Sequence, residues 1–429
     1  MYQLLTKYGN NLILQTMKVR VVITGMGMLT PLGNNVETTW GSLLSGASGI
    51  SGITRFDTSA FPCRIAGELK GFDPLAYMTA KEAHRLDPFV QYALAAALMA
   101  VEDSRLSFTP NSLLRTGVLV GSGRGGVMTT EKNMAALLSK GPKGVSPFYT
   151  PMSLVNMASG YLAMKLGAQG PCLDVSTACA TGTHAVGEAM KIIQRGNADI
   201  MIAGGTEAAL TPLILAGFCQ VKAVSLRNSD PQKASRPFEK NRDGFVLAEG
   251  AGVLVLEERG HAEKRGARIY AELAGYGLTS DAYHYTRPDP EGTGSSRAMS
   301  LALGDAGMGP EQIEYINAHG TSTISNDRIE TRAIHKTFGA HARNLAVSSS
   351  KSMLGHMLGA AGAVEAAVTA LSLFKGILPP TINYETADPE CNLDTVPNKA
   401  RMHQAKAALS NSLGFGGTNA ALVFIKDPK

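Results

Sequence analysis

The pentapeptide VSTAC at residues 175–179 ends one predicted strand and begins a helix rich in small residues. VSSSK at residues 347–351 stands between a second predicted strand and helix, 172 residues further along the chain. A second pair of segments, GAGVLVL at 250–256 and TNAALVF at 418–424, repeats at a spacing of 168 residues. Two repeats at similar spacing indicate a duplicated fold. We therefore predict two α/β halves, residues 17–258 and 268–429, which are joined by a charged segment and share one core.

Helical and strand patterns alternate along most of the chain. Apolar and β-branched runs predict strands near 19–24, 116–120, 171–176, 199–203, 313–317 and 344–348. Helices are predicted near 79–104, 151–167, 179–196 and 356–375. This alternation is typical of βαβ units, so we expect a mainly parallel sheet with helices on both faces.

Charge is scarce in this chain of 429 residues, because charged side chains make up only 17% of it while apolar ones make up 44%. Globular proteins carry about a quarter charged residues, so this composition favours a large core or an oligomer interface. The net charge is +5 and no dense Lys/Arg block occurs, so nucleic acid is not an expected partner. Five cysteines without CxxC spacing indicate a reducing compartment.

The longest apolar stretch, residues 357–374, contains Glu365 near its middle. A carboxylate at the centre of a bilayer costs roughly 2.5–3.5 kcal/mol, so we expect a buried helix and no membrane partner. Residues 1–16 contain one Lys and no Arg, which fits neither a signal peptide nor a transit peptide. We expect them to be a leader that is disordered or not native, with Met17 as the effective start.

GSGRGG at residues 121–126 follows a predicted strand and formally fits the GxGxxG pattern. A dinucleotide site also needs an acid about 20 residues further on. No Asp or Glu occurs between Glu131 and Asp174. We therefore expect a tight turn with close backbone approach instead of a cofactor site.

Cys179 stands where a strand gives way to a helix, so its sulfur is expected at a helix N-terminus. Unpaired N–H groups and the helix dipole there favour a thiolate and lower a cysteine pKa below about 8.5. Cys179 is therefore the candidate nucleophile. The alternative, a buried structural cysteine, suits the four others: Cys63, Cys172, Cys219 and Cys391.

Two histidines follow predicted strands: His319 in NAHGTST and His356 in KSMLGH. Carboxyl ends of strands are where α/β sites assemble. Each histidine alone is better explained by a structural role. Together with Cys179 they form a set suited to acyl transfer followed by chemistry on a second substrate. No HExxH motif or Cys/His cluster is present, so no metal site is expected.

Lys351 follows an apolar strand and begins a predicted buried helix. A buried lysine needs a carboxylate partner, for which Asp327, Glu330 and Glu365 are the candidates. We place Lys351 with the catalytic set, as part of a network that orients the histidines, in preference to a catalytic amine. Phe415 lies in the glycine turn GFGGTN. This turn is either an ordinary loop or a mobile aromatic gate that also supplies a backbone N–H to an oxyanion.

The chain resembles the β-ketoacyl-acyl-carrier-protein synthases of the type II elongating kind, in the thiolase superfamily. It shares four motifs in the same order over residues 18–425: DVSTACATGTHAVGEA, NAHGTSTISND, SSSKSMLGHMLGAAGAVE and NSLGFGGTN. The resemblance implies a thiolase-like five-layer αβαβα fold built from two duplicated halves. It also implies a cytoplasmic homodimer, with a heterodimer as the alternative.

The resemblance further implies a decarboxylative condensation. Cys179 would take an acyl group from acyl carrier protein, and the N–H groups of Cys179 and Phe415 would hold the thioester oxygen. His319 and His356 would assist loss of the malonyl carboxylate. No metal or organic cofactor is implied, because phosphopantetheine arrives on the carrier protein.

Further positions are carried over from the same family. Implied substrate-binding residues are Thr321, Thr323, Arg124, Ile214, Phe218 and Gly416, and an implied basic rim for the carrier protein is formed by Lys81, Arg85 and Lys222. The family usually has a small or aliphatic residue at the position of Arg124, on the floor of the acyl pocket. Arg124 either shortens the pocket, binds a polar or carboxylate chain end, or turns toward an acid in the dimer interface. Ile214 is bulkier than the family norm and also favours a restricted pocket.

Two other functions remain as alternatives. A thiolase acting on coenzyme A esters ordinarily has a second cysteine in the C-terminal glycine turn, where this chain has Phe415. A non-catalytic subunit that sets chain length in a heterodimer has no need of Cys179, His319 and His356.

Overall fold

The computed structural model describes residues 3–8, 11–16 and 18–427, and for 3–8 and 11–16 only the course of the backbone. The expected leader, residues 1–16, contains the first two of these segments. Strands β1 (Gln3–Tyr8) and β2 (Asn11–Thr16) pair antiparallel. Residues 1, 2, 9 and 10 and the expected start at Met17 lie outside the described residues.

Within the described residues, ten strands form one sheet in the order β12-β11-β15-β16-β10-β3-β9-β8-β6-β7. The first half contains β3 (Val21–Leu29), β6 (Thr116–Gly121), β7 (Cys172–Leu173), β8 (Ile200–Glu207) and β9 (Gly250–Glu258). The second contains β10 (Ala271–Ser280), β11 (Tyr315–Asn317), β12 (Ala346–Ser348), β15 (Ala407–Gly414) and β16 (Thr418–Ile425). Outward from the β3–β10 junction, each half places its strands in the order first, fifth, fourth, second and third in the chain. This common order confirms the predicted duplication.

The sheet is mixed, so the prediction of a mainly parallel sheet was wrong. β9 is antiparallel to β3 and β8, and β16 is antiparallel to β10 and β15. A short glycine turn joins β15 to β16, and so short a connection permits only an antiparallel pair. Parallel pairing is found farther out, where β6 pairs with β7 and β8, and β11 with β12 and β15.

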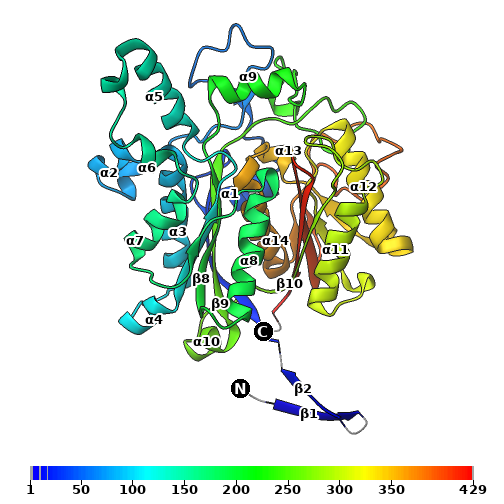
Figure 1. The fold of residues 1–429 in the computed structure, drawn as a ribbon. Helices are drawn as coiled ribbons and strands as arrows, with labels where there is room; N and C mark the ends of the chain where they lie inside the picture. The colour runs from blue at the N-terminus through cyan, green and yellow to red at the C-terminus, as the bar shows by residue number, and fades with distance from the viewer. Residues whose placement is uncertain (1–2, 9–10, 17, 428–429) are drawn as a thin grey trace.

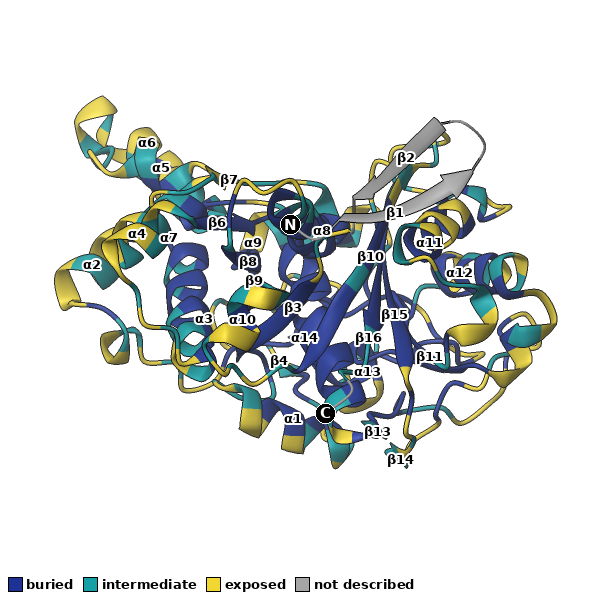
Figure 2. Ribbon diagram, turned by 90° about the horizontal axis from the view of Figure 1, so that it is seen from below, coloured by how far each residue is buried: buried dark blue, intermediate teal, exposed yellow. Residues whose placement is uncertain are grey.

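Helices complete the expected five layers (Figure 1). α8 (Thr181–Gln194) and α14 (Ala361–Lys375) lie between the two halves of the sheet. α3 (Pro88–Ser104) and α7 (Met157–Leu166) cover the outer face of the first half. On the second half, α11 (Thr293–Ala306) packs on the sheet and α12 (Ile324–Phe338) packs against α11. The apolar helix that the sequence placed in the core, Leu358–Lys375, is long enough to span a membrane but is 89% buried inside the protein, as Figure 2 shows for α14.

A glycine at the same place in each half allows an outer helix to lie close to the sheet. Gly27 in β3 faces α3, where a Cβ would lie 2.0 Å from the carbonyl oxygen of Ala96. Gly277 in β10 faces α11, where a Cβ would lie 2.1 Å from the carbonyl oxygen of Ala298. Because any side chain here would collide with helix backbone, both halves need the same GxG pattern at the same place in the fold.

The remaining elements are short or peripheral. The predicted helix at 79–104 is broken before Pro88 into two parts, α2 (Ala80–Arg85) and α3. The other helices are α1 (Val36–Leu44), α4 (Pro110–Leu114), α5 (Val127–Lys140), α6 (Tyr149–Ser153), α9 (Pro212–Gln220), α10 (Arg259–Lys264) and α13 (Lys351–Leu354). The 3₁₀ turns are η1 (Pro74–Ala76), η2 (Pro142–Gly144), η3 (Ala178–Ala180), η4 (Pro231–Lys233), η5 (Pro310–Gln312), η6 (Gly339–Asn344) and η7 (Leu358–Ala360). Two small two-stranded sheets pair β4 (Ser51–Gly52) with β5 (Ile65–Ala66) and β13 (Ile377–Leu378) with β14 (Arg401–Met402).

Candidate active site

Cys179 lies in the turn η3, directly before α8. The residue before it, Ala178, has a φ of 51°, and Leu358 at the matching place before α14 has a φ of 46°. Positive φ is uncommon for residues other than glycine and costs of order 1–3 kcal/mol. Both halves therefore use the same strained entry into their central helix, and in the first half it holds a thiol at the N-terminal end of α8.

The thiol of Cys179 differs from the prediction in one respect. Burial raises its pKa to about 11, although the backbone N–H of Phe415 and the charges of Lys351 and Arg124 act in the opposite direction. The predicted lowering was wrong because it considered only the helix N-terminus, whereas removal of water penalises the thiolate more strongly. The resting form is a thiol, and its proton must leave during the reaction.

His319 and His356 lie side by side and line the same cavity as Cys179. Their ring centroids are 5.3 Å apart at an interplanar angle of 84°, and each residue is only 2% exposed. Burial, assisted by the charge of Lys351, lowers the pKa of both imidazoles well below the usual 6.5. In the part of the chain that the structure describes, the buried Nδ1 atom of each ring has no hydrogen-bond partner. Two neutral rings are thus free to donate to or accept from a bound molecule.

Backbone contacts fix both histidines. The carboxylate of Glu330 on α12 accepts hydrogen bonds of 2.8 Å from the N–H groups of His319 and Gly320. The N–H of His356 donates to the carbonyl of Val246 at 2.7 Å, and its own carbonyl accepts from the N–H of Ala248 at 2.9 Å. Each imidazole is therefore carried on a rigid backbone.

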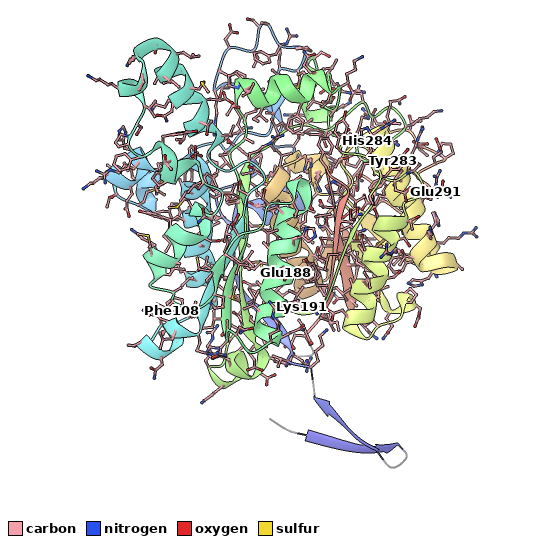
Figure 3. The ribbon with its side chains drawn as sticks, viewed as in Figure 1. Phe108, Glu188, Lys191, Tyr283, His284 and Glu291 are labelled. Carbon is pink, nitrogen blue, oxygen red and sulfur yellow. The ribbon has the colours of Figure 1, made fainter. Side chains whose placement is uncertain are left out.

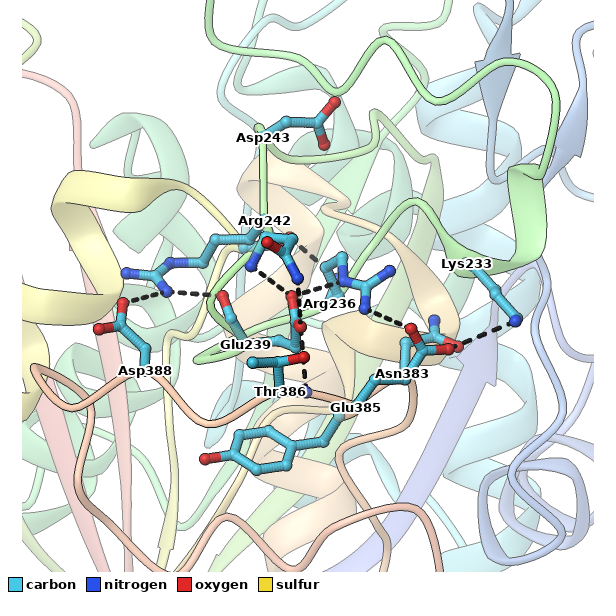
Figure 4. A network of polar contacts seen from close by, with 12 residues as sticks. Lys233, Arg236, Glu239, Arg242, Asp243, Asn383, Glu385, Thr386 and Asp388 are labelled. Atoms are coloured by element: carbon cyan, nitrogen blue, oxygen red, sulfur yellow. Dashed lines mark hydrogen bonds and ion pairs between the residues drawn. The ribbon is translucent and has the colours of Figure 1, made fainter.

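The three acids proposed as partners of Lys351 contact different residues, and Glu330 binds the backbone of His319 and Gly320 as described. Glu365 on α14 forms an ion pair with Lys351, and both side chains are 1% exposed. Asp327 instead accepts from the N–H of Phe238 at 2.8 Å and lies 3.3 Å from Arg242. Figure 4 shows Arg242 in a polar network with Arg236, Glu239 and Asp388, in which its guanidinium is 2.8 Å from Asp388. Lys351, Glu365 and Asp327 do not line the cavity that contains Cys179.

A cavity of about 560 Å³ opens in front of the thiol and the imidazoles. The predicted site residues that line it are Cys179, His319, His356, Phe415, Thr321, Thr323, Arg124, Phe218 and Lys222. Ile214 and Gly416 are not on its surface, although both belong to segments that form its walls, and Lys81 and Arg85 are exposed on α2. The hydroxyls of Thr321 and Thr323 lie 2.9 Å apart.

The glycine turn at Phe415 forms one edge of the cavity. Phe415 itself is 37% exposed, and the next two residues, Gly416 and Gly417, have φ values of 86° and 73°. The N–H of Gly416 donates to the carbonyl of Tyr285 at 2.8 Å. Tyr285 lies on the loop that follows β10 and its ring stacks on that of His284, which Figure 3 labels next to Tyr283. The turn is therefore anchored to the loop after β10, and its partly exposed aromatic ring lines the cavity.

Sequence reasoning missed Glu207. This carboxylate ends β8, lines the cavity and is 0% exposed. It accepts from the hydroxyl of Ser122 and the backbone N–H groups of Gly123 and Gly359 at 3.0 Å, and from that of Arg124 at 3.2 Å. Burial raises its pKa to about 7. The available signal was an acid at the carboxyl end of an apolar strand, IMIAGGTE. The glycine-rich turn at 121–126 thus binds a carboxylate of its own chain.

No group of three or more His, Cys, Asp or Glu side chains that could hold a metal ion occurs among the residues described. The groups that line the cavity include a thiol, two neutral imidazoles and backbone N–H groups.

Comparison with known proteins gives the same picture over nearly the whole chain. The family model for the beta-ketoacyl synthase N-terminal domain matches residues 18–262, and that for the C-terminal domain matches residues 270–385. A Coxiella burnetii protein named 3-oxoacyl-[acyl-carrier-protein] synthase 2 is 53% identical over 406 residues, covering 95% of this chain and 98% of that protein. A protein of the same name from Synechocystis is 51% identical over 409 residues, with the same coverage.

Solved structures agree with these relatives. The ishigamide ketosynthase/chain length factor superposes with a TM-score of 0.90 at 36% identity, covering 96% of this chain and all of that one. A type II polyketide ketosynthase in complex with its acyl-carrier protein, AntDE:AntF, superposes with a TM-score of 0.88 at 36% identity and the same coverage.

Proposed function

Because this chain belongs to the beta-ketoacyl synthase family, we propose a residue-by-residue course for its reaction. The protein is an acyltransferase of the 3-oxoacyl-acyl-carrier-protein synthase class. It condenses an acyl thioester with malonyl-acyl carrier protein, as in fatty acid synthesis. One observation carries the assignment of roles: Cys179 and two neutral imidazoles, His319 and His356, line the same cavity.

The first step transfers the acyl group to Cys179. Its sulfur attacks the thioester carbonyl of the acyl carrier protein, and the carbonyl oxygen becomes an oxyanion that the N–H groups of Cys179 and Phe415 stabilise. When the oxyanion collapses, the phosphopantetheine thiolate leaves and takes up the proton that Cys179 has lost. Because burial raises the pKa of Cys179 to about 11, the resting residue carries this proton and gives it up in the transfer step.

The second step uses malonyl-acyl carrier protein. Its carboxylate leaves as CO₂, and the electron pair of the broken bond forms an enolate. N–H groups of His319 and His356 stabilise the enolate oxygen, and a buried, neutral pair suits this role because it provides no solvent proton to quench the carbanion. The enolate carbon then attacks the Cys179 thioester and expels the sulfur as a thiolate, which lengthens the chain by two carbons. The thiolate takes up a proton from solvent after the product leaves, which restores the resting thiol. The hydroxyls of Thr321 and Thr323 are proposed to bind the pantetheine arm.

Labelled malonyl-acyl carrier protein tests this function. We expect release of labelled CO₂ and, when an acyl primer is present, a 3-oxoacyl product two carbons longer, both undiminished by EDTA because no metal or organic cofactor is proposed. A thiolase would release no CO₂ from malonyl carrier protein. A non-catalytic partner subunit would release none and form no product, so either outcome would overturn the proposal.

Acyl carrier protein is a partner of this enzyme class, and an AntDE:AntF structure holds a ketosynthase with its carrier protein. We propose that exposed Lys81 and Arg85 on α2, together with Lys222 at the cavity, receive its acidic surface. The cytoplasmic location stays a prediction, which cell fractionation would test.

We also propose that the enzyme is a homodimer. β7 is the last strand of its sheet, and its two residues, Cys172 and Leu173, are exposed. Large apolar side chains are exposed on neighbouring α5 and α7: Met134 at 53%, Leu138 at 80% and Met164 at 76%. An uncovered edge strand beside apolar surface is expected to be covered by a second chain. Sedimentation equilibrium of the purified protein should give the mass of two identical chains, and a monomer would contradict the proposal.

A further inference from the structure

One wall of the cavity is a row of aromatic rings. His356 lies 5.3 Å from His319 and 5.4 Å from Phe245, measured between ring centroids, and Phe245 lies 5.1 Å from Phe218. The guanidinium carbon of Arg124 lies 5.7 Å from the centroid of Phe218. The wall therefore leads from the reacting groups along apolar rings to a permanent positive charge.

The guanidinium of Arg124 has no ion pair or hydrogen bond within the residues that the structure describes. The carboxylates that line the cavity, Glu207, Asp243 and Asp281, all have other donors. Glu207 accepts from the backbone of the turn at 121–126 and from the N–H of Gly359. Asp243 accepts from the hydroxyl of Ser225 at 2.6 Å and from the N–H of Leu226 at 3.1 Å. Asp281 accepts from the amide of Asn419 at 2.7 Å and from the N–H of Asp289 at 3.1 Å.

We propose that Arg124 binds the far end of the acyl primer and that this end carries a carboxylate. An arginine is always charged, and bringing a methyl-ended chain against it removes water without replacing its hydrogen bonds. A carboxylate instead accepts two parallel N–H bonds from the guanidinium. The inference rests on the condensation proposed above and names its primer class: acyl thioesters of dicarboxylic acids, with the methylene chain packed along Phe218 and Phe245.

Two six-carbon primers that differ only at the far end test the proposal. Acyl carrier protein is loaded with hexanoyl or with adipoyl groups, and kcat/KM for the 3-oxoacyl product is measured by mass spectrometry. Since hydrogen bonds to charged groups change affinity by roughly ten- to a hundredfold, we expect the wild type to prefer adipoyl at least about tenfold. Arg124→Ile should reverse this preference. Arg124→Lys keeps the charge without the planar guanidinium, so its preference for adipoyl should lie between those of the wild type and Arg124→Ile.

Arg195→Ile, at an exposed arginine after α8, is the matched control and should leave the ratio of the two primers unchanged. The inference is wrong if the wild type has a higher kcat/KM with hexanoyl than with adipoyl carrier protein. It is also wrong if Arg124→Ile changes kcat/KM by the same factor with both primers, whether or not the variant also weakens the dimer. An equal change in both primers together with a weaker dimer would instead assign Arg124 to the subunit interface. Should the wild type elongate neither these primers nor butyryl carrier protein, it is the condensation itself that fails.

Discussion

Replacing Cys179 by alanine is expected to lower formation of the 3-oxoacyl product by at least about 10⁴-fold, the usual order for loss of a covalent nucleophile. Among the described residues that line the cavity, Cys179 carries the only thiol. The acyl group then has no place to be held while the malonyl carrier protein binds. Product formation is followed by mass spectrometry, which also detects the acylated Cys179 peptide in the wild type.

The same variant should still release CO₂ from malonyl-acyl carrier protein, because the imidazoles that stabilise the enolate are untouched. Cys219→Ala is the matched control, since Cys219 is also a free, partly buried cysteine and follows Phe218 on α9. It should retain the wild-type rate. Residual product above about one percent in Cys179→Ala, with unchanged folding, would show that the acyl group is not carried on this residue.

The position of the nucleophile could be predicted from the sequence because it follows from local structure. A short apolar strand, a turn and a run of small residues place Cys179 at the start of a helix wherever that helix lies. The pKa of its thiol could not be predicted in the same way. Burial depends on α14, the Phe415 turn and β16, which come from the other half of the chain. The local effect of the helix N-terminus therefore gave the wrong direction.

The buried acids show the same boundary. Asp327, Glu330 and Glu365 were all possible partners of Lys351, because sequence spacing does not distinguish them. The fold pairs Lys351 with Glu365, while Asp327 faces Arg242. Glu207 was missed since its donors come from two distant segments, the turn at 121–126 and Gly359, and no local pattern joins them.

Alanine at His319 or His356 is expected to lower CO₂ release from malonyl-acyl carrier protein by at least about 10²-fold, the usual order for one oxyanion donor or one acid–base group. Each ring lines the cavity, is neutral and has an Nδ1 atom without a hydrogen-bond partner among the described residues. His319→Asn and His356→Asn keep an N–H donor and should retain more activity than the alanine variants. His335→Ala, a partly buried histidine on α12 that contacts Asn392, is the control and should be unaffected.

The pH dependence distinguishes a buried, neutral imidazole from a solvated one. An ordinary histidine gains its proton as the pH falls through about 6.5, but burial lowers the pKa of both rings well below that value. They therefore stay neutral from pH 8 down to pH 6.5, and the ratio of CO₂ release between the wild type and His319→Asn should be constant over that range. Groups common to both proteins, such as Glu207 with its pKa of about 7, cancel in this ratio. A ratio that falls with a midpoint near pH 6.5 would mean that a solvated imidazole takes part, and the enolate would then lack the dry, neutral donors on which its lifetime depends.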